Sequence, residues 1–154
     1  MMELINKFTT TSSGTIVISS IPQTYSSLRI FANGKPDQDL GMVFNSNSET
    51  RSREFLRMSG STVTLRQVTS SHPLIAQDDV SANPSATYRL DLRVSGYSDT
   101  TKRTCIMAGA WSMGTDRQYG GITGDFFASN TAVTSITLPE IWSIGTKVQV
   151  YGVL

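Results

Sequence analysis

The sequence predicts an all-β protein on three observations. Apolar and polar residues alternate with period two in many short runs, whereas the period of 3.6 that is typical of helices hardly occurs. The 154 residues include 21 Ser, 19 Thr and 12 Gly, and only 16% are charged; Thr favours strands, while Ser and Gly favour turns. Turn sequences separate the runs. Eight or nine short strands in one domain predict two packed antiparallel sheets, and we expect a jelly-roll-like antiparallel β-sandwich.

Each strand is predicted from its own alternation. The clearest is TYRLDLRV at 87–94, in which the apolar residues point one way and Arg89, Asp91 and Arg93 point the other. The run REFLRM at 53–58 is a candidate for a ninth strand. Seven further strands are expected at 15–19, 27–32, 40–44, 61–67, 103–110, 134–138 and 147–154.

The two ends of the sequence carry separate expectations. Residues 1–14 are apolar at Leu4, Ile5 and Phe8, and form either an edge strand or an arm that reaches a neighbouring chain. Residues 15–154 are expected to form the β-sandwich domain. The final run KVQVYGVL should be a strand paired inside a sheet, with Val148, Val150 and Leu154 facing inward.

Two long connections, 69–86 and 112–127, are expected to be loops that make contacts, because loops of this length are usually functional. The second contains Tyr119 and three glycines of QYGGITGDFF, and Trp111 lies just before it. The glycine spacing does not match a phosphate-binding loop. We interpret these glycines as close-packing or bulge positions in a β-protein.

Composition excludes several classes of protein. The formal net charge of +1 argues against a strongly basic nucleic-acid binder. The single cysteine, Cys105, fits assembly in a reducing cytoplasm, and no paired-cysteine metal site is present. No stretch approaches the roughly 20 apolar residues of a membrane span, and the start lacks the pattern of a signal peptide. We therefore expect a soluble protein without metal or cofactor.

The residues that could support catalysis are sparse, and we expect no enzyme. The only histidine, His72, precedes a proline in a predicted turn. Nucleophilic catalysis needs a base held by a third group, and no motif such as G-x-S-x-G occurs. The pairs Asp37 with Asp39 and Asp78 with Asp79 could bind a hard cation, but turn-forming roles are the better interpretation.

A basic cluster and a set of aromatic residues are the remaining candidates for binding. Arg51, Arg53, Arg57 and Arg66 could contact phosphate, but Glu49 and Glu54 are interleaved with them, and an interchain or surface salt-bridge face is the better interpretation. The aromatic residues could form a sugar-binding platform, but filling the core and a subunit interface is favoured. They are Trp111, Tyr119, Phe126, Phe127, Trp142 and Tyr151.

Three segments resemble a family of small virion proteins of tailed bacteriophages and cyanophages. They are TIVISSIPQTYSSLRIFAN at 15–33, KRTCIMAGA at 102–110 and GDFFASNTAVTSITLPEIWSIGTKVQVYGVL at 124–154, whereas 34–101 matches nothing in that family. The resemblance implies a structural protein with no catalytic residues to carry over. It favours a capsid-decorating cement protein, located in the virion and assembled in the bacterial cytoplasm. This protein would act as a homotrimer on the major capsid protein, without contacting nucleic acid or membrane.

The residues expected at its interfaces are Leu4, Ile5, Phe8, Arg51, Arg53, Arg57, Trp111 and Tyr119. The alternative is a tail-fibre or receptor-contacting module of a phage tail, in which an exposed Trp111, Tyr119 or Trp142 would stack on host glycans. An enzyme is the third hypothesis, and the lone histidine argues against it.

Overall fold

A computed structural model describes residues 1–37, 40–46, 51–59, 62–70, 74–76, 87–101, 104–113, 118–126 and 131–154. Within these ranges all regular structure is β-strand, which confirms the all-β prediction. Every strand pairing described is antiparallel. The same residues contain no helix that is long and apolar enough to cross a membrane.

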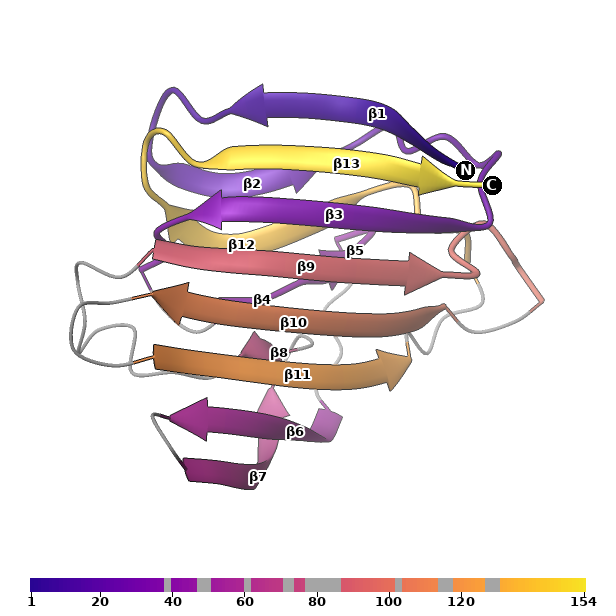
Figure 1. Ribbon diagram of the computed structural model, residues 1–154. Coiled ribbons are helices and arrows are strands. Elements are labelled where there is room, and N and C mark those ends of the chain that lie inside the picture. Colours follow the sequence, from indigo (N-terminus) through magenta and orange to yellow (C-terminus); the bar gives the residue numbers. More distant parts are fainter. Residues whose placement is uncertain are drawn as a thin grey trace.

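The larger layer is an eight-stranded sheet that runs across the front of the molecule in Figure 1. Two interior strands, β3 and β9, pair with each other, and each has a further partner on its other edge, β13 for β3 and β10 for β9. The order is β1 (Met2–Thr9), β13 (Lys147–Val153), β3 (Ser27–Gly34), β9 (Thr87–Ser95), β10 (Cys105–Met113), β11 (Gln118–Phe126), β6 (Arg51–Ser59) and β7 (Thr62–Ser70).

The smaller layer lies behind the large sheet (Figure 1). It consists of a three-stranded sheet, β2 (Gly14–Ile18), β12 (Ile136–Trp142) and β5 (Val43–Phe44), and of the pair β4 (Leu40–Gly41) and β8 (Leu74–Ala76). A strand that is apolar on one face must bury that face against another element. Here each layer buries its apolar face against the other layer.

The core lies between the layers and is built by the alternation seen in the sequence. In β9 the burial pattern alternates over the whole strand, so that Tyr88, Leu90, Leu92 and Val94 face inward as predicted. The larger sheet also contributes Leu28, Ile30, Ala32, Ile106, Ala108, Val148 and Val150, and the smaller layer contributes Ile16, Ile18, Leu40, Phe44, Ile136, Leu138 and Trp142.

All nine predicted strands are present, and the run at 40–44 is divided into β4 and β5 by Met42. The expected loop at 112–127 is wrong, because β10 continues to Met113 and Gln118–Phe126 forms β11. Its glycines interrupt the apolar–polar alternation that predicts a strand, and glycine itself weakens a strand. Ladders with β10 on one side and β6 on the other outweigh that local preference.

The last strand pairs between β1 and β3, and Val148 and Val150 are buried in it as predicted. The inward position expected for Leu154 is wrong, because this side chain is 66% exposed. Ladder pairing ends at Val153, opposite Met2 and Ser27, so Leu154 lies beyond the sheet, where its N–H donates to the carbonyl of Met1.

Gly152 allows an aromatic ring to lie directly on the last strand. A Cβ atom added at Gly152 would be 2.4 Å from Cγ of Tyr25, much closer than carbon atoms can pack. The Tyr25 hydroxyl donates a hydrogen bond of 2.8 Å to Oε2 of Glu3 on β1. Tyr25 therefore connects the segment before β3 with both β13 and β1, and glycine at position 152 is what makes the contact fit.

We predict that Gly152→Ala lowers the free energy of unfolding by about 1–3 kcal/mol, because the new methyl group displaces the Tyr25 ring. Gly124→Ala is the matched control, since its Cβ would be 3.9 Å from the nearest atom, the carbonyl oxygen of Ile106. It should change stability by no more than about 0.5 kcal/mol. Urea denaturation of both variants measures this, and equal losses would contradict the proposed contact.

Candidate functional site

The outward face of the large sheet is the candidate site. Residues directly opposite each other in an antiparallel pair point to the same face, so the register defines which side chains share it. One row across the sheet runs from Tyr151 through Arg29 and Arg93 to Met107. The next row runs through Gln149, Phe31, Asp91, Gly109, Ile122, Leu56 and Leu65.

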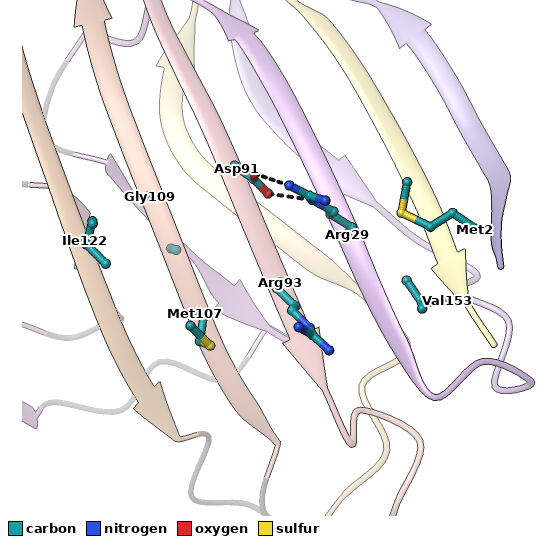
Figure 2. Close-up of a pocket in the computed structure, with 9 residues that line it drawn as sticks. Met2, Arg29, Asp91, Arg93, Met107, Gly109, Ile122 and Val153 are labelled. Carbon is teal, nitrogen blue, oxygen red and sulfur yellow. Dashed lines mark hydrogen bonds and ion pairs between the residues drawn. The ribbon is translucent and has the colours of Figure 1, made fainter.

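A bidentate ion pair lies at the centre of this face. Arg29 on β3 donates from Nε to Oδ1 of Asp91 at 3.1 Å and from Nη2 to Oδ2 at 2.7 Å (Figure 2). These hydrogen bonds, and then the negative charge of Asp91, raise the pKa of the Arg29 guanidinium. The two side chains remain 42% and 29% exposed, so the pair orders the guanidinium more than it stabilises the fold.

An aromatic ring also contacts the same guanidinium. Cζ of Arg29 lies 4.8 Å from the ring centroid of Phe31, a cation–π distance. The Phe31 ring in turn meets Tyr151 edge to face, with centroids 5.9 Å apart and an interplanar angle of 80°. Arg29 is therefore fixed in direction by a carboxylate and a ring that both lie on neighbouring positions of the sheet.

Arg93 on β9 lies directly opposite Arg29 in the ladder. Like charges in this position repel each other and weaken a sheet. Both carboxylate oxygens of Asp91 are bonded to Arg29, and no carboxylate among the described residues pairs with Arg93. The Arg93 side chain is exposed, and its hydrogen-bond donors are available to a binding partner.

A depression of about 430 Å³ lies beside these arginines. Figure 2 shows Arg29, Asp91 and Arg93 near its middle, with Met2 and Val153 on one side and Met107 and Ile122 on the other. Gly109, which lies opposite Asp91, has no side chain on the outward face, so the surface is recessed at this position. The depression thus combines a cationic centre with apolar sides.

Apolar side chains continue from the depression toward β7. Met107 is 57% exposed and Ile122 is 51% exposed. Ile122, Leu56 and Leu65 follow one another across β11, β6 and β7, and the last two are also exposed. Val63 and Leu65, which the sequence placed in an alternating strand, are both exposed. An apolar row of this kind on a sheet is typical of a protein-binding surface.

The predicted N-terminal contact residues divide between two environments. Leu4 is 48% exposed and lies opposite Tyr151, on the outward face. Ile5 and Phe8 are partly buried and pack against the core of the chain itself. Residues Met2–Thr9 form the edge strand of the large sheet by pairing with β13, so these side chains extend an existing sheet.

The other predicted contact residues lie on strands of the large sheet. Arg51, Arg53 and Arg57 belong to β6, Trp111 to β10 and Tyr119 to β11, but their side chains are outside the described part of the structure. Trp142 is fully buried on β12, in agreement with the core-filling interpretation, so it cannot stack on a glycan as the alternative tail-fibre hypothesis requires. A tryptophan at an inward position of an alternating strand belongs to the core.

Of the acidic residues and the histidine considered for cation binding or catalysis, only Asp37 lies among the described residues. His72, Asp39, Asp78 and Asp79 lie outside the described residues. Asp37 accepts a hydrogen bond of 2.9 Å from the backbone N–H of Ile141, in keeping with a structural role. Among the described residues no group of three or more His, Cys, Asp or Glu could hold a metal ion.

Arg29, Asp91 and Arg93 did not stand out as a site in the sequence. The alternation in TYRLDLRV places Arg89, Asp91 and Arg93 on the solvent side of one strand, and this pattern was visible. Their meeting with Arg29 depends on the pairing of β3 with β9, which are separated by more than fifty residues. Periodicity within a strand does not reveal the neighbouring strand.

A buried carboxyl group lies on the opposite side of the sheet, between the layers. Glu140 on β12 is 1% exposed, its Oε1 accepts a hydrogen bond from the backbone N–H of Gly41, and its Oε2 has no partner among the described atoms. Burial raises the pKa of Glu140 to about 7, and the charge of Asp37 acts in the same direction. The N–H groups of Glu140, Gly41 and Trp142 offset part of this rise, although Trp142 Nε1 is too poorly placed to count as hydrogen-bonded.

We predict that this carboxyl group makes the protein less stable as the pH rises from about 4.5 to about 7. The folded state keeps the proton in this window and the unfolded state does not, so about 3 kcal/mol of stability is lost across it. Glu140→Gln should abolish this loss of stability with rising pH, whereas Glu3→Gln, at an exposed position, should leave it unchanged. Urea denaturation from pH 4.5 to pH 8 measures the difference, and parallel pH curves for the parent and Glu140→Gln would contradict the assignment.

Comparison of the chain with models of protein families, with curated proteins and with solved structures found no match.

Proposed function

We propose that this chain is a virion structural protein that decorates a phage capsid and stabilises it by bridging subunits of the major capsid protein. The observation that supports this function is the outward face of the large sheet, a surface fixed by eight paired strands that combines exposed apolar side chains with arginines. Met, Arg and aromatic residues are enriched in protein interfaces. The resemblance of the segments at 15–33, 102–110 and 124–154 to small virion proteins points to the capsid as the partner.

The proposed activity is binding, and its effect is thermodynamic. A protein that binds the assembled capsid but not the free subunits stabilises the assembly by mass action. A rigid sheet loses little conformational freedom on docking, so less of the contact energy is spent on ordering the surface. The proposal includes three further points. The chain folds as a jelly-roll-like sandwich, acts as a homotrimer in the virion, and is assembled in the bacterial cytoplasm.

A second function is supported by a different feature of the same face. Phe31 and Tyr151 are partly exposed aromatic residues, and a tail-fibre or receptor-contacting module would use such residues to bind host glycans. Their edge-to-face arrangement, with Arg29 over Phe31, leaves no pair of coplanar rings as a sugar platform. Capsid decoration therefore remains the first proposal, and binding of the purified protein to a glycan array would favour the second.

We predict that Met107→Asp weakens binding to heads purified from virions that lack the chain by at least about tenfold, because it places a charge in the apolar part of the interface. Val17→Asp is the matched control: Val17 is similarly exposed, at 55%, but lies on β2 in the smaller layer. Co-sedimentation with heads measures binding, and thermal melting checks that both variants are folded.

The outcomes separate the proposals. Loss of binding for Met107→Asp with normal binding for Val17→Asp supports docking through the outward face. Equal loss for both variants, or none for either, contradicts docking through this face. Failure of the parent protein to bind heads at all would contradict the capsid function itself.

A further inference from the structure

Positive charge is concentrated on the outward side of five strands, β1, β13, β3, β9 and β10. The whole chain has a formal net charge of only +1, so this side differs from the rest of the molecule. By register, the outward positions of these strands hold one carboxylate, Asp91, and five cationic side chains, Lys7, Lys147, Arg29, Arg89 and Arg93. A surface of this kind attracts a partner of the opposite charge.

Within this surface the depression contains the group best placed to bind an anion. Asp91 is fully engaged by Arg29, which leaves Arg93 without a carboxylate partner among the described residues. A guanidinium matches a carboxylate in a planar, two-bond arrangement. Arg29 lies directly opposite Arg93 and adds a second positive charge to the site. A carboxylate bound to Arg93 would therefore also reduce the repulsion between the two arginines.

The apolar sides of the depression define what surrounds that carboxylate. Met107 and Ile122 lie on one side of Arg93, and Met2 and Val153 lie on the other (Figure 2). A docked partner would exclude water here, which strengthens a charge-assisted hydrogen bond. We infer that the depression binds a glutamate or aspartate side chain from an acidic, apolar-flanked segment of a partner protein; this deepens the proposed function, on which it rests, by naming the chemistry of the docked surface.

Nucleic acid fits this surface less well. A single-stranded nucleic acid needs aromatic faces on which bases can stack. Among the side chains that the structure describes on this surface, Phe31 has one face covered by Arg29 and meets Tyr151 edge to face. If a phosphate backbone bound here, the exposed side chains of Met107 and Ile122 would have no apolar group to contact. A protein segment in which acidic and apolar residues alternate would satisfy both kinds of side chain.

The test uses two peptides and the intact protein. The acetylated, amidated peptide Leu-Glu-Leu-Glu-Leu is compared with Leu-Gln-Leu-Gln-Leu, and a 20-nucleotide oligo-dT is the nucleic-acid probe. Binding is followed at low salt by NMR, through the arginine Nε–H signals and the backbone amides. Arg93→Gln is compared with Arg89→Gln, a matched control on the same strand and face that does not line the depression.

We expect the glutamate peptide to shift the signals of Arg93 and Arg29 and to bind at least about tenfold more tightly than the glutamine peptide. Arg93→Gln should remove that difference, whereas Arg89→Gln should weaken binding by less than about twofold. Equal binding of the two peptides, or equal effects of the two substitutions, would overturn the inference. Binding of oligo-dT in preference to the glutamate peptide would overturn it in favour of nucleic acid.

Co-sedimentation of the Arg93→Gln variant with heads separates this inference from the proposed function. If the parent binds the peptide as expected but not heads, the carboxylate site stands and the capsid function fails. If the parent and Arg93→Gln bind heads equally and the peptides are not distinguished, the carboxylate site fails and the capsid function stands.

Discussion

The pairing of β13 between β1 and β3 is the constraint on which the rest of the structure depends. It joins the first strand to β3 and through β3 to the rest of the large sheet, so that residues from both ends of the sequence contribute to one layer. Every backbone N–H and C=O group inside a sheet needs a partner, and β13 supplies partners on both of its edges. Val148 and Val150 add its apolar face to the core, while Gly152 leaves room for Tyr25 to pack on the strand.

The alternation that builds the core also builds the candidate site. Where Leu28, Ile30, Leu90 and Leu92 face inward on β3 and β9, the intervening positions face outward at a fixed spacing. The ladder between these strands therefore sets Arg29 beside Asp91 and opposite Arg93 without any loop to position them. A site carried on strands is held more firmly than one carried on loops.

Much of the fold could be predicted from single strands, but their arrangement could not. Alternation is a local property, so TYRLDLRV and KVQVYGVL were recognisable as strands with defined inward faces. The strand Gln118–Phe126 could not be predicted because its glycines interrupt the alternation, and its ladders with β10 and β6 depend on long-range pairing. The site was missed for a related reason: Arg29 and Arg93 are far apart in sequence and meet through long-range pairing.

Native-state hydrogen exchange of the intact protein tests most directly whether β13 holds the outward face as a rigid platform. We predict that the amides of Val148 and Val150 exchange only through global unfolding, with the same opening free energy as the amides of Leu90 and Leu92 in β9. Exchange of the β13 amides through openings of much lower free energy, while the β9 amides stay protected, would contradict it. The last strand would then detach on its own, and the face that it supports would not be a preformed binding surface.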